Sequence, residues 1–276
     1  MSAQSPLLQR DAGVRTPGTV CTAPRFSIGK VRISAVTMAE TLRLVQDQAR
    51  SGTSAYICVA NVRVVIMAQK DADFCSIQNN SFLTIPDGMP LVWYGRLAGV
   101  PGLGRVTGPD LVVNLLGVSA EREYSHYFYG DTKETLSKVC RVIGERYPGT
   151  VVKGTCSPPF RALTDGEVEA TVREINWLRP TFVWVGLGAP KQERFMAEVA
   201  PRTDGAILVG VGAAFRFLIG QYKHPPSIIQ KCGLEGVCWR FLSHPIREAR
   251  WYAYHVPAFG WLTAKMLARR LSGKSP

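Results

Sequence analysis

The segment that most constrains this chain runs from Thr181 to Glu193 and reads TFVWVGLGAPKQE. Its apolar first half predicts a buried strand, and its glycine-rich second half predicts a turn that re-enters a helix at Pro190. A backbone bared by Gly186 and Gly188 at a helix N-terminus offers free N–H groups and the helix dipole to an anion. An ordinary strand–turn–helix crossover explains the two glycines equally well.

Three polar residues, Lys191, Gln192 and Glu193, follow directly in the expected first helical turn. Pro190 suits that turn because an N–H there has no helical partner to lose. The polar groups favour a site for a diphosphate or a sugar. A dinucleotide fingerprint is not indicated, since G-x-G-x-x-G needs a third glycine where this chain has Lys191. No G-x-x-x-x-G-K-[ST] occurs either, so a P-loop nucleotidase is unsupported.

The composition sets the broad class of the protein. A chain of 276 residues with 46% hydrophobic content can bury the core of one large α/β domain with an appendage. Residues 1–25 are polar with scattered Pro, Gly and Arg, which predicts a disordered leader rather than a signal peptide. Seven cysteines without a C-x-x-C pair indicate reduced thiols, and four histidines at unhelpful spacing do not suggest structural zinc.

Apolar runs alternate with helical patterns along the chain. This alternation predicts an α/β fold with a mostly parallel sheet covered by helices on both faces. Strands are expected at 56–60, 82–85, 124–129, 151–153, 182–185 and 207–211, and helices after Asn61 and at 92–97, 109–118, 132–146 and 167–178. Ligands of such sheets bind beyond the carboxyl ends of the strands. Asn61, Asp87, Gly130-Asp131, Gly186–Glu193 and Gly210–Ala214 all follow expected strands, and this convergence favours a site there.

Five runs, in this order, resemble one protein family: IPDGMPLVW, RVTGPDL, VGLGAPKQERF, VGVGAAFRFLIG and LEGVCWRFLSHPIREARWY. They are similar to bacterial glycosyltransferase family 26, the teichoic-acid linkage-unit and N-acetylmannosaminuronic acid transferases. The resemblance covers roughly residues 28 to 252. It implies a Rossmann-like core with a C-terminal membrane-associating appendage. The implied reaction moves a sugar from a UDP-sugar to a polyprenyl-diphosphate-linked saccharide, with inversion and without a metal or another cofactor.

The resemblance also implies roles for individual residues, and their chemistry suits them. An inverting transfer needs a carboxylate that takes the proton of the acceptor hydroxyl, and Asp87 in the Pro-Asp-Gly turn is our candidate for this base. Arg105 is a candidate for clamping a diphosphate, because a guanidinium fork matches phosphate oxygens. Asn61 would hydrogen-bond the substrate as a third catalytic residue. The expected substrate-binding residues are Gly186, Gly188, Pro190, Lys191, Gln192, Glu193, Gly212 and Arg216.

Each catalytic candidate has a purely structural alternative. Asp87 can serve its turn or cap the next helix, Asn61 can be an N-cap, and Arg105 can be a solvated surface residue. The Asp71-Ala72-Asp73 triplet matches the metal-binding D-x-D of many glycosyltransferases, but it lies in a helical stretch, where residues two apart point away from each other. A solvated helical face is the expectation, with no metal.

The C-terminal segment is strongly basic and rich in tryptophan. Residues 216–276 hold ten Lys or Arg against two acids, a net +8 of the chain's formal +12, and three of the six tryptophans. Cations interleaved with aromatic rings predict a segment that lies on an anionic bilayer. His255, Pro257 and Lys265 interrupt every apolar window of spanning length. A basic solvated tail is the alternative, whereas nucleic acid is not expected, because no recognition motif accompanies the patch.

The resemblance implies that Arg240, Arg247 and Arg250 hold the acceptor diphosphate, with Pro245 kinking any helix that carries all three. The chain departs from the family at Arg216, where G-x-F-D usually has its acid, and at Lys223-His224-Pro225, where Arg-Ala-Pro is usual. A cation at position 216 would retune the donor toward an acidic or unacetylated sugar, or alter how uracil is held.

These observations predict three parts: a leader at 1–25, a glycosyltransferase core at 26–222 and a basic appendage at 223–276. The expected protein is a cytoplasmic enzyme of envelope or exopolysaccharide assembly, peripheral on the inner face of the cell membrane, with homo-oligomerisation possible. Two other classes stay open. An NAD(P)-dependent oxidoreductase would bind a dinucleotide, and a non-catalytic membrane-surface binding protein would turn over no UDP-sugar.

Overall fold

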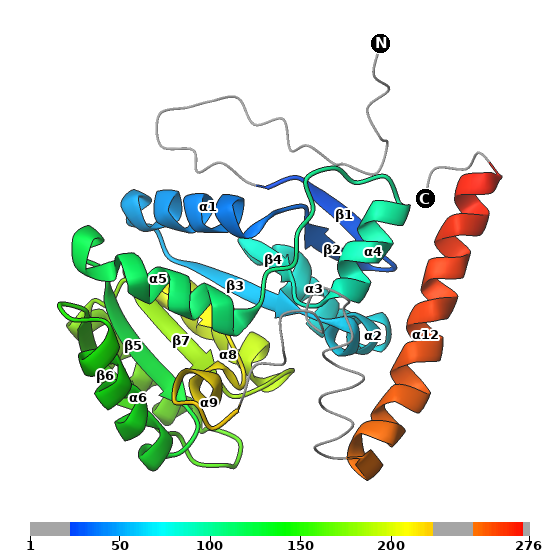
Figure 1. The fold of residues 1–276 in the computed structure, drawn as a ribbon. Coiled ribbons are helices and arrows are strands. Elements are labelled where there is room, and N and C mark those ends of the chain that lie inside the picture. The colour runs from blue at the N-terminus through cyan, green and yellow to red at the C-terminus, as the bar shows by residue number, and fades with distance from the viewer. Residues whose placement is uncertain (1–22, 223–244, 273–276) are drawn as a thin grey trace.

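The computed structural model describes residues 23–222 and 245–272, and its centre is a parallel sheet (Figure 1). The sheet has six strands in the order β4-β3-β8-β7-β5-β6, and an antiparallel hairpin joins β1 to β2. The strands are β1 (Arg25–Ile28), β2 (Val31–Ser34), β3 (Ala55–Ala60), β4 (Leu83–Pro86), β5 (Ser125–Gly130), β6 (Val151–Cys156), β7 (Phe182–Gly186) and β8 (Ile207–Gly210). The helices are α1 (Met38–Ser51), α2 (Val62–Lys70), α3 (Ala72–Asn80), α4 (Met89–Leu97), α5 (Gly108–Arg122), α6 (Lys133–Arg146), α7 (Asp165–Leu178), α8 (Lys191–Val199), α9 (Ala214–Leu218) and α12 (Pro245–Leu271).

The α/β class and the parallel sheet expected from the sequence are confirmed. Each of the six expected strands begins within about one residue of its predicted start, because an apolar run flanked by turn residues marks a buried strand well. The hairpin and α1 go beyond the sequence prediction. The packed structure also begins earlier than residue 26, since Ala23 is buried and β1 starts at Arg25.

Helices cover both faces of the sheet. Leu44 of α1, Leu115 of α5 and Val139 of α6 pack with Trp184 on one face. Alternate residues of the same strands face the other way, where Val183 and Leu208 pack against helices α7 and α8. Both faces of a parallel strand are therefore buried, which explains the nearly continuous apolar runs.

N-cap side chains determine where several helices begin. Thr37 forms a capping box with Glu40 at the start of α1, so each side chain satisfies a backbone N–H of the other residue. Thr107 and Thr132 are simple N-caps of α5 and α6, each accepting from an N–H three residues on. Both helices thus start next to the carboxyl ends of the strands.

The C-terminal helix α12 packs on a second apolar cluster beside the sheet (Figure 1). Phe259, Leu262 and Met266 are its buried residues, at the three- and four-residue spacing of one helical stripe. They contact the hairpin, α2 and α4, which places α12 at the β4 side of the sheet. None of the helices in the described part of the chain is both long and apolar enough to cross a bilayer.

Candidate active site

The carboxyl ends of the parallel strands bring most of the predicted site residues to one edge. Asp87 follows β4, Asn61 follows β3, Gly212 lies just after β8 and Gly186 ends β7. Because β4, β3, β8 and β7 are consecutive neighbours in the sheet, the four positions form a continuous row. Parallel strands direct their carboxyl ends to the same edge, where ligands of such sheets bind.

Backbone hydrogen bonds join the three catalytic candidates side by side. The Asp87 N–H donates to the carbonyl of Ala60, directly before Asn61, over 2.7 Å. The N–H of Val106, directly after Arg105, donates to the carbonyl of Pro86 over 2.9 Å. Arg105, Asp87 and Asn61 therefore lie on three adjacent backbone segments, although 44 positions separate the outer two in the sequence.

Asp87 lies in the turn between β4 and α4, one residue before the N-cap of the helix. The N-cap of α4 is Gly88, whose φ of +108° suits glycine and whose lack of a side chain leaves the cap without a side-chain hydrogen bond. Asp87 therefore precedes the helix instead of capping it. Its side chain is half-buried at the edge of the sheet, so a carboxylate here can meet a ligand.

Asn61 is the N-cap of α2. Its Oδ1 accepts from the Val64 N–H over 3.2 Å, which confirms the capping role that the sequence left open. The cap uses the oxygen of the amide alone. A substrate contact would therefore have to come from the Nδ2 group, held in place by the cap.

Arg105 is not a solvated surface arginine. Its side chain is only 16% exposed, and its Nη2 lies 3.7 Å from Oδ2 of Asp110 in the first turn of α5. The residue stands in the loop that leads into the N-cap of this helix, Thr107. A guanidinium in this place adds to the positive end of the α5 dipole, which favours an anionic ligand.

Gln192 joins the turns after β7 and β8. Its Oε1 accepts from the Gly188 N–H over 3.1 Å and from the Gly212 N–H over 3.0 Å. The expectation of a free N–H at Gly188 is therefore wrong: a side chain from inside the protein occupies it. Gln192 is buried and holds the two glycine turns at a fixed separation, so the structure gives it a positioning contact.

Of the three polar residues at the start of α8, only Lys191 is exposed. The helix begins at Lys191, and Pro190 is its N-cap, one residue outside the expected first turn. Glu193 has 0% exposure and accepts from Gln192 Nε2 over 3.0 Å. Its Oε2 has no hydrogen-bond partner among the described residues. Burial raises the pKa of Glu193 to about 7, against the opposing effects of the Gln192 hydrogen bond and of Arg63.

Arg216, the cation at the family's acidic position, is paired. Its Nε and Nη2 bind the two carboxylate oxygens of Asp131 over 2.9 and 3.1 Å, and its Nη1 lies 3.3 Å from the Tyr222 hydroxyl. The Arg216 contacts hold the pKa of Asp131 below its usual range in spite of partial burial, which acts in the opposite direction. Asp131 follows β5, so this fork-to-fork pair sits at the far end of the row.

Glycines allow the strand ends near this pair to approach one another. A Cβ on Gly130 would lie 2.7 Å from the backbone of Gly186, and one on Gly186 would lie 2.6 Å from the Phe215 ring. Neither position has room for a larger residue. The turns after β5, β7 and β8 therefore form one tightly packed floor.

The D-x-D triplet, Asp71-Ala72-Asp73, lies outside this row. Asp71 is the N-cap of α3, and its Oδ2 accepts from Arg194 over 2.6 Å, so it serves a helix start and an ion pair. Asp73 lies in the first turn of α3, but Asp71 has an extended backbone just outside that helix, so the expectation of a fully helical triplet is wrong at Asp71. In the part of the chain that the structure describes, no three His, Cys, Asp or Glu side chains gather into a metal-binding group.

Of the three C-terminal arginines expected to bind the acceptor diphosphate, two belong to the residues that the structure describes. Arg240 lies outside the described residues. Arg247 and Arg250 belong to α12, whose described part begins at Pro245, so a kink between Arg240 and these two arginines stays a prediction. Lys223-His224-Pro225 also lies outside the described residues.

Two features of the site escaped the sequence prediction. The pairing of Asp131 with Arg216 spans 85 positions and leaves no local signal. The burial of Gln192 and Glu193 had a signal, because Gln192, Phe195, Met196 and Val199 repeat at helical spacing and form the buried stripe of α8.

The profile of the Glycosyl transferase WecG/TagA/CpsF family matches residues 26–273. The chain belongs to this family. A Bacillus subtilis (strain 168) protein named N-acetylglucosaminyldiphosphoundecaprenol N-acetyl-beta-D-mannosaminyltransferase is 28% identical over 199 residues, 71% of this chain and 74% of the relative.

Two further relatives carry the same name. One, from Bacillus spizizenii, is 27% identical over 244 residues, 87% of this chain and 88% of the relative. The other, from Staphylococcus aureus (strain NCTC 8325), is 23% identical over 188 residues, 68% of this chain and 72% of the relative. The resemblance found in the sequence is thereby confirmed at the level of the family.

Proposed function

We propose that this glycosyltransferase moves an N-acetylmannosamine-type sugar from its UDP derivative to a polyprenyl-diphosphate-linked saccharide, with inversion at the anomeric carbon. The main support for this proposal is that backbone hydrogen bonds bring Arg105, Asp87 and Asn61 together at the carboxyl edge of the sheet. The names of the relatives supply the sugar and the diphospho-undecaprenol acceptor. The product is a lipid-linked intermediate of a cell-envelope polymer.

Asp87 acts as the general base of a single displacement. The carboxylate takes the proton of the acceptor hydroxyl while the oxygen attacks the anomeric carbon, and the bond from that carbon to the diphosphate breaks with its electron pair. UDP leaves from the opposite face, so the configuration inverts. Arg105 stabilises the charge that develops on the diphosphate, because its guanidinium can donate two parallel hydrogen bonds to phosphate oxygens. Asn61 Nδ2 positions a sugar hydroxyl.

The donor nucleotide occupies the β5–β7 end of the row. The connection leaving β5 runs to β6 on one side, and that leaving β7 runs to β8 on the other. A crevice between strands whose connections diverge is where ligands of open α/β sheets bind. Gln192 fixes the Gly188 turn, on the β7 side of this crevice, to the Gly212 turn after β8. This chain has a cation, Arg216, where the family usually has an acid. Because Asp131 neutralises Arg216, the change does not leave a free positive charge facing the donor.

The acceptor approaches from the C-terminal side. Arg240, Arg247 and Arg250 bind its diphosphate, and the basic appendage rests on the inner face of the membrane as a peripheral contact. Support comes from the net +8 of residues 216–276 and from the packing of α12 beside α2, the helix that Asn61 caps. The start of α12 thus belongs to the same side of the molecule as the catalytic row (Figure 1).

We expect chelators to leave the activity unchanged. Arg105 and the helix N-termini supply the positive charge that a divalent ion provides in other transferases. Initial rates with 5–10 mM EDTA, roughly a thousandfold above trace-metal levels, should lie within about two-fold of the untreated rate. Loss of activity in EDTA that Mg²⁺ or Mn²⁺ restores would contradict this prediction and would return attention to Asp71 and Asp73.

A donor panel tests the function as a whole. Purified full-length protein is incubated with several UDP-sugars and N-acetylglucosaminyl-diphosphate carrying a short prenyl chain, and UDP release is measured together with the glycolipid product. The expected result is product with UDP-N-acetylmannosamine, with the anomeric configuration inverted. Binding of NAD(P) without transfer would favour an oxidoreductase. Vesicle binding without turnover of any UDP-sugar would favour a non-catalytic membrane protein.

A further inference from the structure

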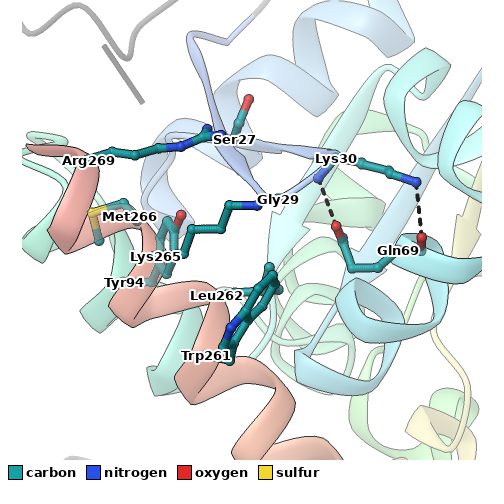
Figure 2. Close-up of a pocket in the computed structure, with 10 residues that line it drawn as sticks. All are labelled: Ser27, Gly29, Lys30, Gln69, Tyr94, Trp261, Leu262, Lys265, Met266 and Arg269. Atoms are coloured by element: carbon teal, nitrogen blue, oxygen red, sulfur yellow. Dashed lines mark hydrogen bonds between the residues drawn. The ribbon is translucent and has the colours of Figure 1, made fainter. Parts of the chain in front are cut away.

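A basic pocket lies where α12 crosses the β1–β2 hairpin, away from the catalytic row (Figure 2). Its volume is about 390 Å³, which is room for a headgroup-sized ligand. The hairpin, the end of α2, α4 and the C-terminal half of α12 provide its walls. Three of the lining residues are cations, Lys30, Lys265 and Arg269, and none of the lining residues is acidic.

The packing of α12 fixes two of these cations over the pocket. Leu262 and Met266 are buried against the second apolar cluster, so this stripe of the helix is held against the body of the protein. Lys265 and Arg269 are four residues apart, hence on one helical face beside that stripe. Figure 2 shows both side chains extending from α12 toward the strand that carries Ser27 and Gly29.

The opposite wall is equally well held. The Lys30 N–H donates to Gln69 Oε1 over 3.0 Å, and the Lys30 ammonium donates to the Gln69 carbonyl over 3.2 Å. Gly29 has a φ of +60°, and a Cβ there would lie 2.3 Å from Gln69 Oε1. The hairpin turn is therefore tied to the last turn of α2, which makes the pocket a built feature and not a gap between loose segments.

Another lining residue adds a neutral donor. Burial raises the pKa of Tyr94 to about 12, and the nearby Arg269 opposes this only in part. The Tyr94 hydroxyl thus stays protonated at neutral pH and can donate a hydrogen bond. Two positive side chains with a hydroxyl donor between hairpin and helix match the oxygens of a phosphate group.

The rim of the pocket has the character of a membrane–water interface. Trp261 is 62% exposed, and Lys265 Nζ lies 4.9 Å from the centre of its ring. Leu271, two residues beyond Arg269 of the pocket, is 89% exposed, and Leu97 is exposed where Arg270 hydrogen-bonds its carbonyl. Exposed indole and aliphatic groups next to basic side chains are typical of helices that lie in the headgroup layer.

We propose that this pocket binds the phosphate of an anionic glycerophospholipid and so docks the protein on the bilayer in one orientation. The ligand is distinct from the reacting acceptor, because the pocket and the catalytic row lie at opposite ends of α2. Asn61 caps its first turn and Gln69 stands in its last, eight residues or about 12 Å along the axis. The inference rests on the proposed function only for the reason why the enzyme meets a membrane.

The test is the partitioning of the full-length protein onto vesicles that contain no polyprenyl lipid. Vesicles of phosphatidylcholine with 30% phosphatidylglycerol are compared with pure phosphatidylcholine, at a physiological salt concentration of roughly 0.15 M. A Lys265→Gln, Arg269→Gln double variant should bind the anionic vesicles about 25-fold more weakly, since each basic side chain near such a surface contributes about five-fold. Free inorganic phosphate at 10 mM, on the order of cellular levels, should not compete, because it lacks the bilayer contacts of Trp261.

The matched control removes the same charges elsewhere. Lys133→Gln with Arg141→Gln deletes one exposed lysine and one exposed arginine from α6, at the other end of the sheet (Figure 1). Its partitioning should change less than about three-fold, because α6 lies beyond the Debye length from a bilayer docked at α12. Equal losses in the two double variants would overturn the proposal and leave a diffuse charge effect.

A variant that fills the pocket without changing the charge separates a site from a basic surface. Ser27 lines the pocket from an exposed position of β1, so Ser27→Phe should block it and weaken anionic-vesicle binding about ten-fold. Unchanged binding would also overturn the proposal. Transfer to a short-chain, water-soluble acceptor is expected to stay at the wild-type rate in Ser27→Phe. Failure of that transfer in the wild type would count against the proposed function alone, since the vesicle assay needs no turnover.

Discussion

An Asp87→Asn variant is expected to turn over about 10²–10⁴-fold more slowly than the wild type, while its affinity for UDP stays the same. Asparagine keeps the shape of the side chain and the Asp87 N–H bond to Ala60, which belongs to the backbone. What it loses is the ability to take a proton from the acceptor hydroxyl, and a positioned general base contributes a rate factor of this size. The measurements are kcat with saturating donor and acceptor and the Kd for UDP.

The control for this variant is a nearby carboxylate that is not placed to act as a base. Asp110 lies 3.7 Å from Arg105 and is 42% exposed. Asp110→Asn removes a charge next to the same arginine, so it should change kcat by less than about ten-fold, which is the scale of one partly exposed ion pair. Near-normal turnover in a folded Asp87→Asn protein would exclude Asp87 as the base.

The sequence correctly predicts that Asp87 and Asn61 each follow a strand, and it can do so because the signal is local. Both residues end an apolar run and begin a turn, and a strand end is a local property of the chain. Once all strands are taken as parallel, their carboxyl ends must share one edge, so two separate local signals predict a common site. The family resemblance then supplied the chemistry, and its profile match over residues 26–273 confirms the family.

The sequence could not give the order of the strands or the contacts across them. β8 is the last strand in the described part of the chain, yet it inserts between β3 and β7. That insertion brings the Gly212 turn next to the Gly188 turn, where Gln192 joins them. The same long-range closure brings Arg216 onto Asp131. A contact of this kind depends on the packing of the whole sheet, which no short window of the sequence contains.

Polar residues at a helix start illustrate a different limit. The sequence prediction aimed Lys191, Gln192 and Glu193 at a ligand because they are hydrophilic, but two of them face the interior. Their partners explain the exception: Gln192 satisfies two loop amides and also one oxygen of Glu193. A buried polar group is tolerated when such hydrogen bonds replace its contacts with water. Glu193 is left with one oxygen outside this network.

Glu193 should therefore make the protein less stable as the pH rises. Its pKa is raised to about 7 in the folded protein and is close to 4.5 in an unfolded chain. Between these values the folded state binds more protons than the unfolded state, so the free energy of unfolding falls as the pH increases through this window. Below pH 4.5 the effect is absent, and above pH 7 it is complete at about 3 kcal/mol, since one pKa unit corresponds to about 1.4 kcal/mol.

A Glu193→Gln substitution isolates this contribution, because the amide keeps an oxygen for the Gln192 Nε2 hydrogen bond but cannot ionise. Urea unfolding at pH 4.5, 6 and 8 should show similar stabilities for variant and wild type at the lowest pH and a more stable variant at pH 8, by up to about 3 kcal/mol. Glu198→Gln, at an exposed position of the same helix, should follow the wild type at every pH. If the wild type and Glu193→Gln lose stability in parallel between pH 4.5 and 8, the Glu193 carboxyl is solvated or paired in solution, and its burial at the start of α8 does not hold.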